Sequence, residues 1–160
     1  MSDLRILWRR RIAFVAAVAW LLFIWSNSLQ TAEESSQVSR GVLAWLVPFL
    51  ARSGIPEELW HTLIRKLAHM AEFAAAGVLW FAALWSGKEK MSRIYRKCSG
   101  AAWLICIAAA VLDETIQKFV PGRSGELRDV CIDAIGSLMG ILVMAIVIRI
   151  WECRKFTGKV

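Results

Sequence analysis

Four long apolar segments divide the chain, and each carries its polar residues toward one end. They cover residues 9–28, 64–86, 99–119 and 129–151. A helix needs about 20 residues to cross the hydrocarbon core of a bilayer, and its backbone groups must be paired within the segment. The pattern therefore predicts an all-α integral membrane protein, a single domain over residues 1–160 with four transmembrane helices. The first segment also has features of a signal peptide, but it lacks a clear cleavage site, which favours an uncleaved helix.

Composition supports the membrane class and argues against binding to nucleic acid. The chain is 58% hydrophobic, has a mean hydropathy of +0.51 and contains nine Trp. A soluble domain of this length could not bury so much apolar surface. The net charge of +7 is basic. However, the sequence contains neither a Gly-rich phosphate loop nor an array of basic and aromatic residues.

The distribution of basic residues predicts the orientation of the helices. The N-terminus, the loop after the second segment and the C-terminal tail together hold 13 of the 20 basic residues. The other side of the membrane is acidic on balance. Because basic loops stay in the cytoplasm, both termini are expected on the cytoplasmic side of the membrane.

Ionisable residues inside the predicted spans gather, together with the polar Gln117, in one layer near the outer side. Counting from the cytoplasmic ends at 1.5 Å per residue places all of them in the outer third of the bilayer. The members of this layer are His69, Glu72, Asp113, Glu114, Gln117, Asp129 and Asp133. Residues at helix ends often only reach into the interface, which explains Lys118, Arg128 and even Arg65. The deeper members favour a functional site, since intramembrane charges usually have a function.

Helical spacing places several of these residues on shared faces. One face of the second helix carries Arg65, His69 and Glu72, with Lys66 about a quarter-turn away. One face of the fourth helix carries Asp129, Asp133, Gly136 and Gly140. The G-x-x-x-G pair allows another helix to approach closely, either within the fold or in a homo-oligomer. Because charges avoid lipid, the polar faces should converge on one another.

Two connections on the outer side are also informative. Pro121-Gly122 marks a turn that carries Arg123 over the acidic layer. Its guanidinium could hold a phosphate in a bidentate manner, or could pair with Asp129 or Glu126. In the long first loop, residues 41–51 are too short to span the membrane and are broken by Pro48. This segment is expected to be interfacial or re-entrant over the outer face.

These residues together resemble the VanZ-like membrane proteins. The resemblance is carried by "RKLAHMAEF", "DETIQKFVPGRSGELRD" and "DAIGSLMG", with the earlier "SNSLQTAEESSQVS". The family is named for a protein linked to low-level resistance to the glycopeptide antibiotic teicoplanin. The resemblance implies a membrane protein of the bacterial cell envelope and leaves its particular role open.

Three classes of function fit these observations. The favoured class binds, or binds and processes, an anionic lipid-linked ligand such as a cell-wall precursor or an isoprenyl phosphate. The expected ligand-binding residues are Arg65, Lys66, His69, Glu72, Asp113, Glu114, Gln117, Arg123, Asp129 and Asp133. Catalytic candidates are His69, Glu72, Asp113 and Glu114, although no activated nucleophile is evident. The alternatives are a metal-dependent hydrolase, for which no known metal signature is matched, and a non-enzymatic transporter or interaction scaffold.

Overall fold

A computed structural model describes residues 2–31, 33–34, 37, 41, 57–85 and 91–157. Its long helices are α1 (Ser2–Ser28), α3 (Glu57–Leu84), α4 (Met91–Gln117) and α5 (Leu127–Thr157). Each contains a stretch long and apolar enough to cross a membrane: Leu4–Ser28, Thr62–Leu84, Arg96–Gln117 and Leu127–Trp151. The four expected membrane-spanning helices are therefore present. The segment expected to be interfacial or re-entrant lies outside the described residues, apart from Gly41.

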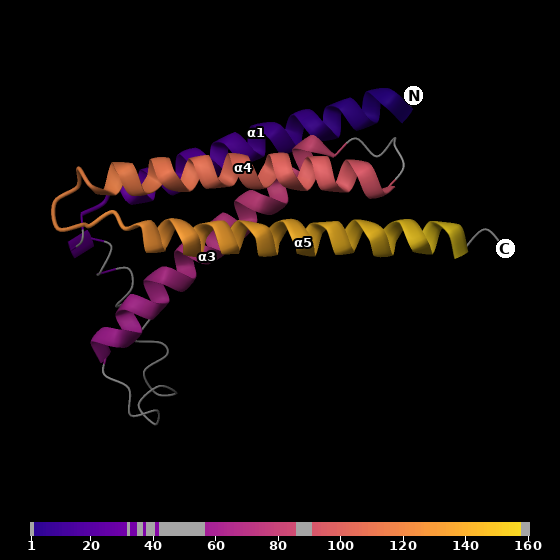
Figure 1. Ribbon diagram of the computed structural model, residues 1–160. Coiled ribbons are helices and arrows are strands. Elements are labelled where there is room, and N and C mark those ends of the chain that lie inside the picture. The colour runs from indigo at the N-terminus through magenta and orange to yellow at the C-terminus, as the bar shows by residue number, and fades with distance from the viewer. Residues whose placement is uncertain are drawn as a thin grey trace.

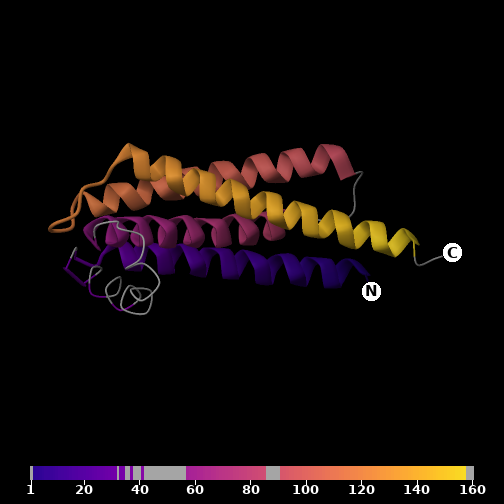
Figure 2. The same cartoon turned by 90° about the horizontal axis from the view of Figure 1, so that it is seen from below.

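The four helices form a bundle whose two ends differ in character. In Figure 1, α1, α4 and α5 lie roughly parallel to one another, while α3 crosses them obliquely. Figure 2 shows α4 and α5 in one layer above α1 and α3. Both termini lie at one end of the bundle, and the turn between α4 and α5 lies at the other. Because α3 packs against all three other helices, it is central to the arrangement.

The interior of the bundle is apolar over most of its length. Its buried residues include Leu21 and Ile24 from α1, Phe73 and Phe81 from α3, and Ile141 from α5. The outer faces are also apolar, and they are lined by exposed side chains such as Leu22, Leu104 and Val143. A surface of this kind suits lipid and not water.

Glycines allow α3 and α5 to lie in close contact. A Cβ atom at Gly136 would lie 2.3 Å from the carbonyl oxygen of Met70, and one at Gly140 would lie 1.9 Å from that of Ala74. On the opposite side, a Cβ atom at Gly77 would lie 2.2 Å from the carbonyl oxygen of Ser137. The G-x-x-x-G pair thus serves a helix contact within the chain. A homo-oligomer would need a different face, because α3 covers this one.

Tryptophan side chains tie the helices together near the polar end. The indole Nε1 of Trp20 on α1 donates to the carbonyl oxygen of Glu72 on α3 at 2.9 Å. Trp25 likewise donates to Ala109 on α4 at 3.3 Å. Trp103 on α4 donates to Ala134 on α5 at 2.9 Å. These bonds fix the register of four helices around the layer of ionisable residues.

Candidate functional site

Three ionisable side chains from three helices meet inside the bundle. His69 on α3, Asp113 on α4 and Asp133 on α5 each offer a ligand atom, and these atoms lie within 4.8 Å of one another. Asp113 is 0% exposed and Asp133 is 1% exposed. The expected convergence of the polar faces of α3, α4 and α5 is therefore observed. We call these three residues the His–Asp cluster.

Most polar atoms of the His–Asp cluster have no hydrogen-bond partner. Neither carboxylate oxygen of Asp133 is paired, and the same holds for Oδ1 of Asp113 and Nδ1 of His69. The other oxygen of Asp113 accepts a hydrogen bond from Nε2 of Gln117 at 2.9 Å. Buried polar atoms are nearly always paired in folded proteins, so this concentration of unpaired atoms calls for an explanation.

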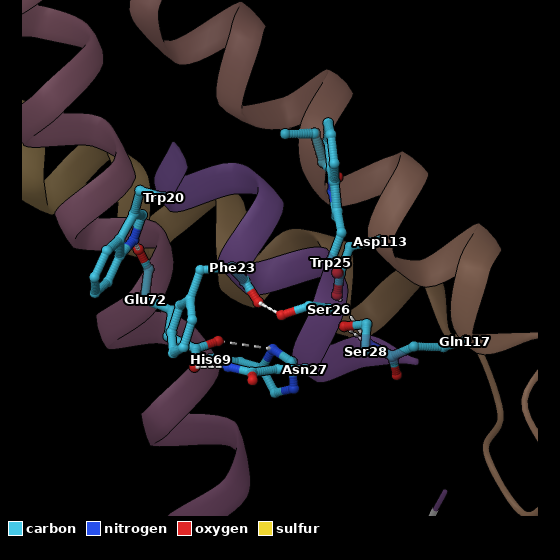
Figure 3. Close-up of polar contacts among 11 residues, drawn as sticks. Trp20, Phe23, Trp25, Ser26, Asn27, Ser28, His69, Glu72, Asp113 and Gln117 are labelled. Atoms are coloured by element: carbon cyan, nitrogen blue, oxygen red, sulfur yellow. Dashed lines mark hydrogen bonds and ion pairs between the residues drawn. The ribbon is translucent and has the colours of Figure 1, made fainter. Parts of the chain in front are cut away.

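Helix α1 contributes to the same region through its last turn. Nδ2 of Asn27 donates to Oε1 of Glu72 at 3.2 Å. Oε2 of Glu72 lies 3.8 Å from Nδ1 of His69. The hydroxyl oxygen of Ser28 accepts a hydrogen bond from Nε2 of Gln117 at 3.4 Å (Figure 3). Asn27 and Ser28 were not foreseen as part of the site, although the polar "SNS" that ends an apolar segment marks them.

A cavity of about 250 Å³ opens beside the cluster at the end of the bundle that carries the α4–α5 turn. Most of its wall is polar. Its lining residues are Thr62, Arg65, Lys66, His69, Glu114, Gln117, Gly122, Arg123, Ser124, Glu126, Arg128, Asp129, Ile132 and Asp133. His69 and Asp133 belong both to this lining and to the His–Asp cluster. Of the ten expected ligand-binding residues, only Glu72 and Asp113 do not line the cavity.

The basic residues of the cavity differ in their partners. Nζ of Lys66 forms an ion pair with Oδ1 of Asp129, so the charge of Lys66 is balanced within the protein. In contrast, Nε of Arg123 is buried without a hydrogen-bond partner. Burial, followed by the nearby positive charge of Arg65, lowers the pKa of Arg123 from its ordinary value. Among the described residues Arg123 forms no ion pair, so the alternative pairing with Asp129 or Glu126 is not observed.

The turn that carries Arg123 packs against the C-terminal end of α4. Gly122 has a φ of 77°, a conformation that favours glycine. Oε2 of Glu114 accepts a hydrogen bond from the backbone N–H of Glu126 at 2.9 Å, just before α5 begins. At Gly125 a Cβ atom would lie 2.1 Å from the carbonyl oxygen of Glu114. Glu114, a catalytic candidate from the sequence, therefore also anchors the turn.

Four apolar helices that enclose a layer of ionisable residues at one end define a multi-pass membrane protein with a polar site. The family model described as VanZ/LLP1 matches residues 13–149 of this chain. The chain therefore belongs to the VanZ/LLP1 family, as its sequence motifs indicate. No curated protein and no solved structure gives a significant match.

Proposed function

We propose that this protein binds a phosphate-bearing lipid head group in the cavity lined by Arg65 and Arg123. The observation that carries the proposal is a pair of arginine side chains in one cavity, neither of which forms an ion pair among the described residues. Guanidinium groups bind phosphate through charge-assisted, often bidentate hydrogen bonds. An anion between the two arginines would pair the buried Nε of Arg123 and relieve the repulsion between the two charges.

The size and position of the cavity favour a lipid-linked ligand. About 250 Å³ is smaller than most pockets for drug-sized molecules, but it is sufficient for a phosphate or diphosphate group. The cavity is lined by residues near the ends of the candidate membrane-spanning stretches, such as Thr62, Gln117 and Asp129, and lipid phosphates lie at the ends of such stretches. An isoprenyl phosphate, alone or as the lipid end of a cell-wall precursor, has this chemistry. Any sugar or peptide attached to it would extend out of the cavity.

The proposal is for binding and not for bond cleavage. Ser124 is the hydroxyl nearest to Arg123 in the turn, and it is exposed. Its Oγ contacts Oε1 of Glu126 at 3.5 Å, the outer limit for a hydrogen bond. A serine nucleophile needs a closely positioned base, and this contact is too long to supply one.

We further propose that the cavity faces the outside of the bacterial cytoplasmic membrane. The opposite end of the bundle holds both termini. That end carries exposed basic residues, which include Arg5, Arg9, Arg11, Arg96, Lys97, Arg149 and Arg154. Such residues are retained on the cytoplasmic side.

This orientation predicts a labelling pattern. In a variant whose other cysteines are replaced by serine, Cys153 should react with a membrane-impermeant maleimide only after the cells are permeabilised. Ser124→Cys in a cysteine-free background should react in intact cells, because Ser124 is exposed at the cavity end. Labelling of Cys153 in intact cells, with Ser124→Cys protected, would reverse the proposed orientation.

The proposed function predicts that ligand binding depends on Arg123. Purified protein in detergent should bind farnesyl phosphate, a short isoprenyl phosphate, and should not bind farnesol. Arg123→Gln should weaken this binding about 10- to 150-fold, since a hydrogen bond to a charged group contributes about 1.5–3 kcal/mol. The affinity of Arg123→Lys should lie between those of the wild type and Arg123→Gln, because lysine keeps the positive charge but lacks the planar guanidinium group. Microscale thermophoresis measures the affinity of the wild type for farnesyl phosphate and for farnesol, and the affinities of both variants for farnesyl phosphate.

Lys118→Gln is the matched control for this experiment. Lys118 lies in the same turn region and is exposed, but it does not line the cavity. Its loss should leave the affinity unchanged. Equal weakening by Lys118→Gln and Arg123→Gln would show a general charge effect and contradict a specific site. Equal binding of farnesol and farnesyl phosphate would contradict recognition of phosphate.

A further inference from the structure

We infer that the His–Asp cluster is a binding site for a divalent transition-metal ion, with zinc the best fit. His69, Asp113 and Asp133 supply one imidazole and two carboxylates from three different helices. Their ligand atoms lie within 4.8 Å of one another. Ligand atoms at about 2.0–2.2 Å from a zinc ion lie about 3–4 Å apart, so small side-chain rotations would place all three on one ion.

The unpaired buried oxygens independently indicate a missing cationic partner. Asp133 is 1% exposed and both of its oxygens lack partners, while Asp113 is 0% exposed and its Oδ1 is unpaired. Burying unpaired carboxylates carries a large free-energy penalty. A proton shared between the two carboxyl groups would pair only one oxygen of each and would leave the second oxygen of Asp133 without a partner. A bound divalent ion would pair the carboxylates and the imidazole together.

The balance of charge around Asp133 also fits a divalent ion. The carboxylates that act on Asp133 electrostatically are Asp113, Glu114, Asp129 and Glu72. Asp129 is already paired with Lys66. Four carboxylates, those of Glu72, Asp113, Glu114 and Asp133, then face two guanidinium groups, those of Arg65 and Arg123. Carboxylates therefore outnumber the guanidinium groups around Asp133, and a cation bound between the carboxylates would offset this excess.

Neighbouring groups hold two of the three ligands in place. Gln117 donates to the second oxygen of Asp113 at 2.9 Å. Oε2 of Glu72 lies 3.8 Å from Nδ1 of His69 and would accept its N–H after a small adjustment, which leaves Nε2 of His69 to bind the ion. Metal ligands in proteins are usually oriented by partners of this kind.

The ligand set favours zinc over magnesium or calcium. Imidazole suits zinc and its neighbours among the transition metals, whereas magnesium and calcium prefer oxygen ligands alone. Three protein ligands leave a fourth position of a zinc ion open. Since His69 and Asp133 also line the cavity, the ion would lie beside the proposed phosphate site. This inference goes beyond the proposed function and does not depend on it.

Zinc binding by the full-length protein tests the inference. The affinity tag is removed, the detergent-solubilised protein is treated with a chelator, and zinc ions are titrated in a calorimeter. One ion per chain should bind and should raise the temperature of unfolding. Asp133→Asn and Asp113→Asn should each weaken binding at least about 100-fold, since even residues that only orient a ligand contribute 10- to 100-fold. Glu126→Gln is the control, because Glu126 lines the cavity outside the cluster.

Absence of zinc binding by the folded wild-type protein would overturn the inference, whatever the variants do. Unchanged affinity in folded Asp133→Asn would also overturn it. Titration of farnesyl phosphate into the same chelator-treated protein separates the two proposals. Binding of farnesyl phosphate without binding of zinc would contradict only the inferred metal site. Binding of zinc without binding of farnesyl phosphate would contradict only the proposed function.

Discussion

Replacing Gly140 with leucine is expected to prevent the protein from folding. A Cβ atom at this position would lie 1.9 Å from the backbone oxygen of Ala74, which cannot rotate away. The substitution would therefore force α3 and α5 apart along the most extensive contact in the bundle. Packing is a main source of helix association in membranes. We expect a loss of more than about 3 kcal/mol, since overpacking alone typically costs 1–3 kcal/mol. Reversible unfolding in mixed micelles, or the yield of monodisperse protein, measures the effect.

Gly100→Leu is the matched control for Gly140→Leu. Gly100 lies within α4, and a Cβ atom there would meet no other atom within 4 Å. Its replacement should leave stability nearly unchanged, because leucine also has the higher helix propensity. Equal stability of the Gly140→Leu variant and the wild type would contradict the observed packing and would place this face of α5 against lipid.

Gly125→Val is expected to weaken ligand binding strongly while the four helices remain folded. A Cβ atom at Gly125 would lie 2.1 Å from the backbone oxygen of Glu114, so the turn must lift from the end of α4. The hydrogen bond between Glu114 and the N–H of Glu126 would then break. Because Arg123 is two residues away in the same turn, it would leave the cavity. The affinity for farnesyl phosphate should fall at least about tenfold, the equivalent of a 1.4 kcal/mol loss.

Ser124→Ala tests whether the effect comes from the backbone of the turn. Ser124 is the exposed neighbour of Gly125, and among the described residues its side chain makes one hydrogen bond, which is long. Its removal should leave both affinity and stability unchanged. Circular dichroism should report the same helix content for both variants. Wild-type affinity in the Gly125→Val variant would contradict the proposed position of Arg123.

The fold could be predicted from the sequence because membranes impose simple rules. Hydropathy and segment length define the four helices, and the depth of His69, Asp113 and Asp133 follows from counting along each helix. The polar face of each helix, on which these residues lie, follows from helical periodicity. The convergence of these residues was therefore predictable, since charged groups avoid lipid and only the bundle interior remains.

The details of the site depend on how the helices are rotated about their axes, and periodicity does not determine this rotation. Asn27 was missed because the polar "SNS" shows only where the first apolar segment ends, and does not show that the last turn of α1 reaches Glu72. The pairing of Lys66 with Asp129, which leaves Arg65 and Arg123 for an anion, required the packed structure. Glu114 is buried because the turn folds back onto it, which helical periodicity does not indicate.

Native mass spectrometry of the purified protein tests the central claim most directly. The wild-type protein, released gently from detergent, should retain one phosphate-bearing lipid per chain. Lys118→Gln should retain the same lipid. The double variant Arg65→Gln/Arg123→Gln should be detected without a bound lipid, although its stability should be similar to that of the wild type. A wild-type protein without a bound lipid, or equal retention by the folded double variant, would contradict the claim that these arginines hold a lipid phosphate.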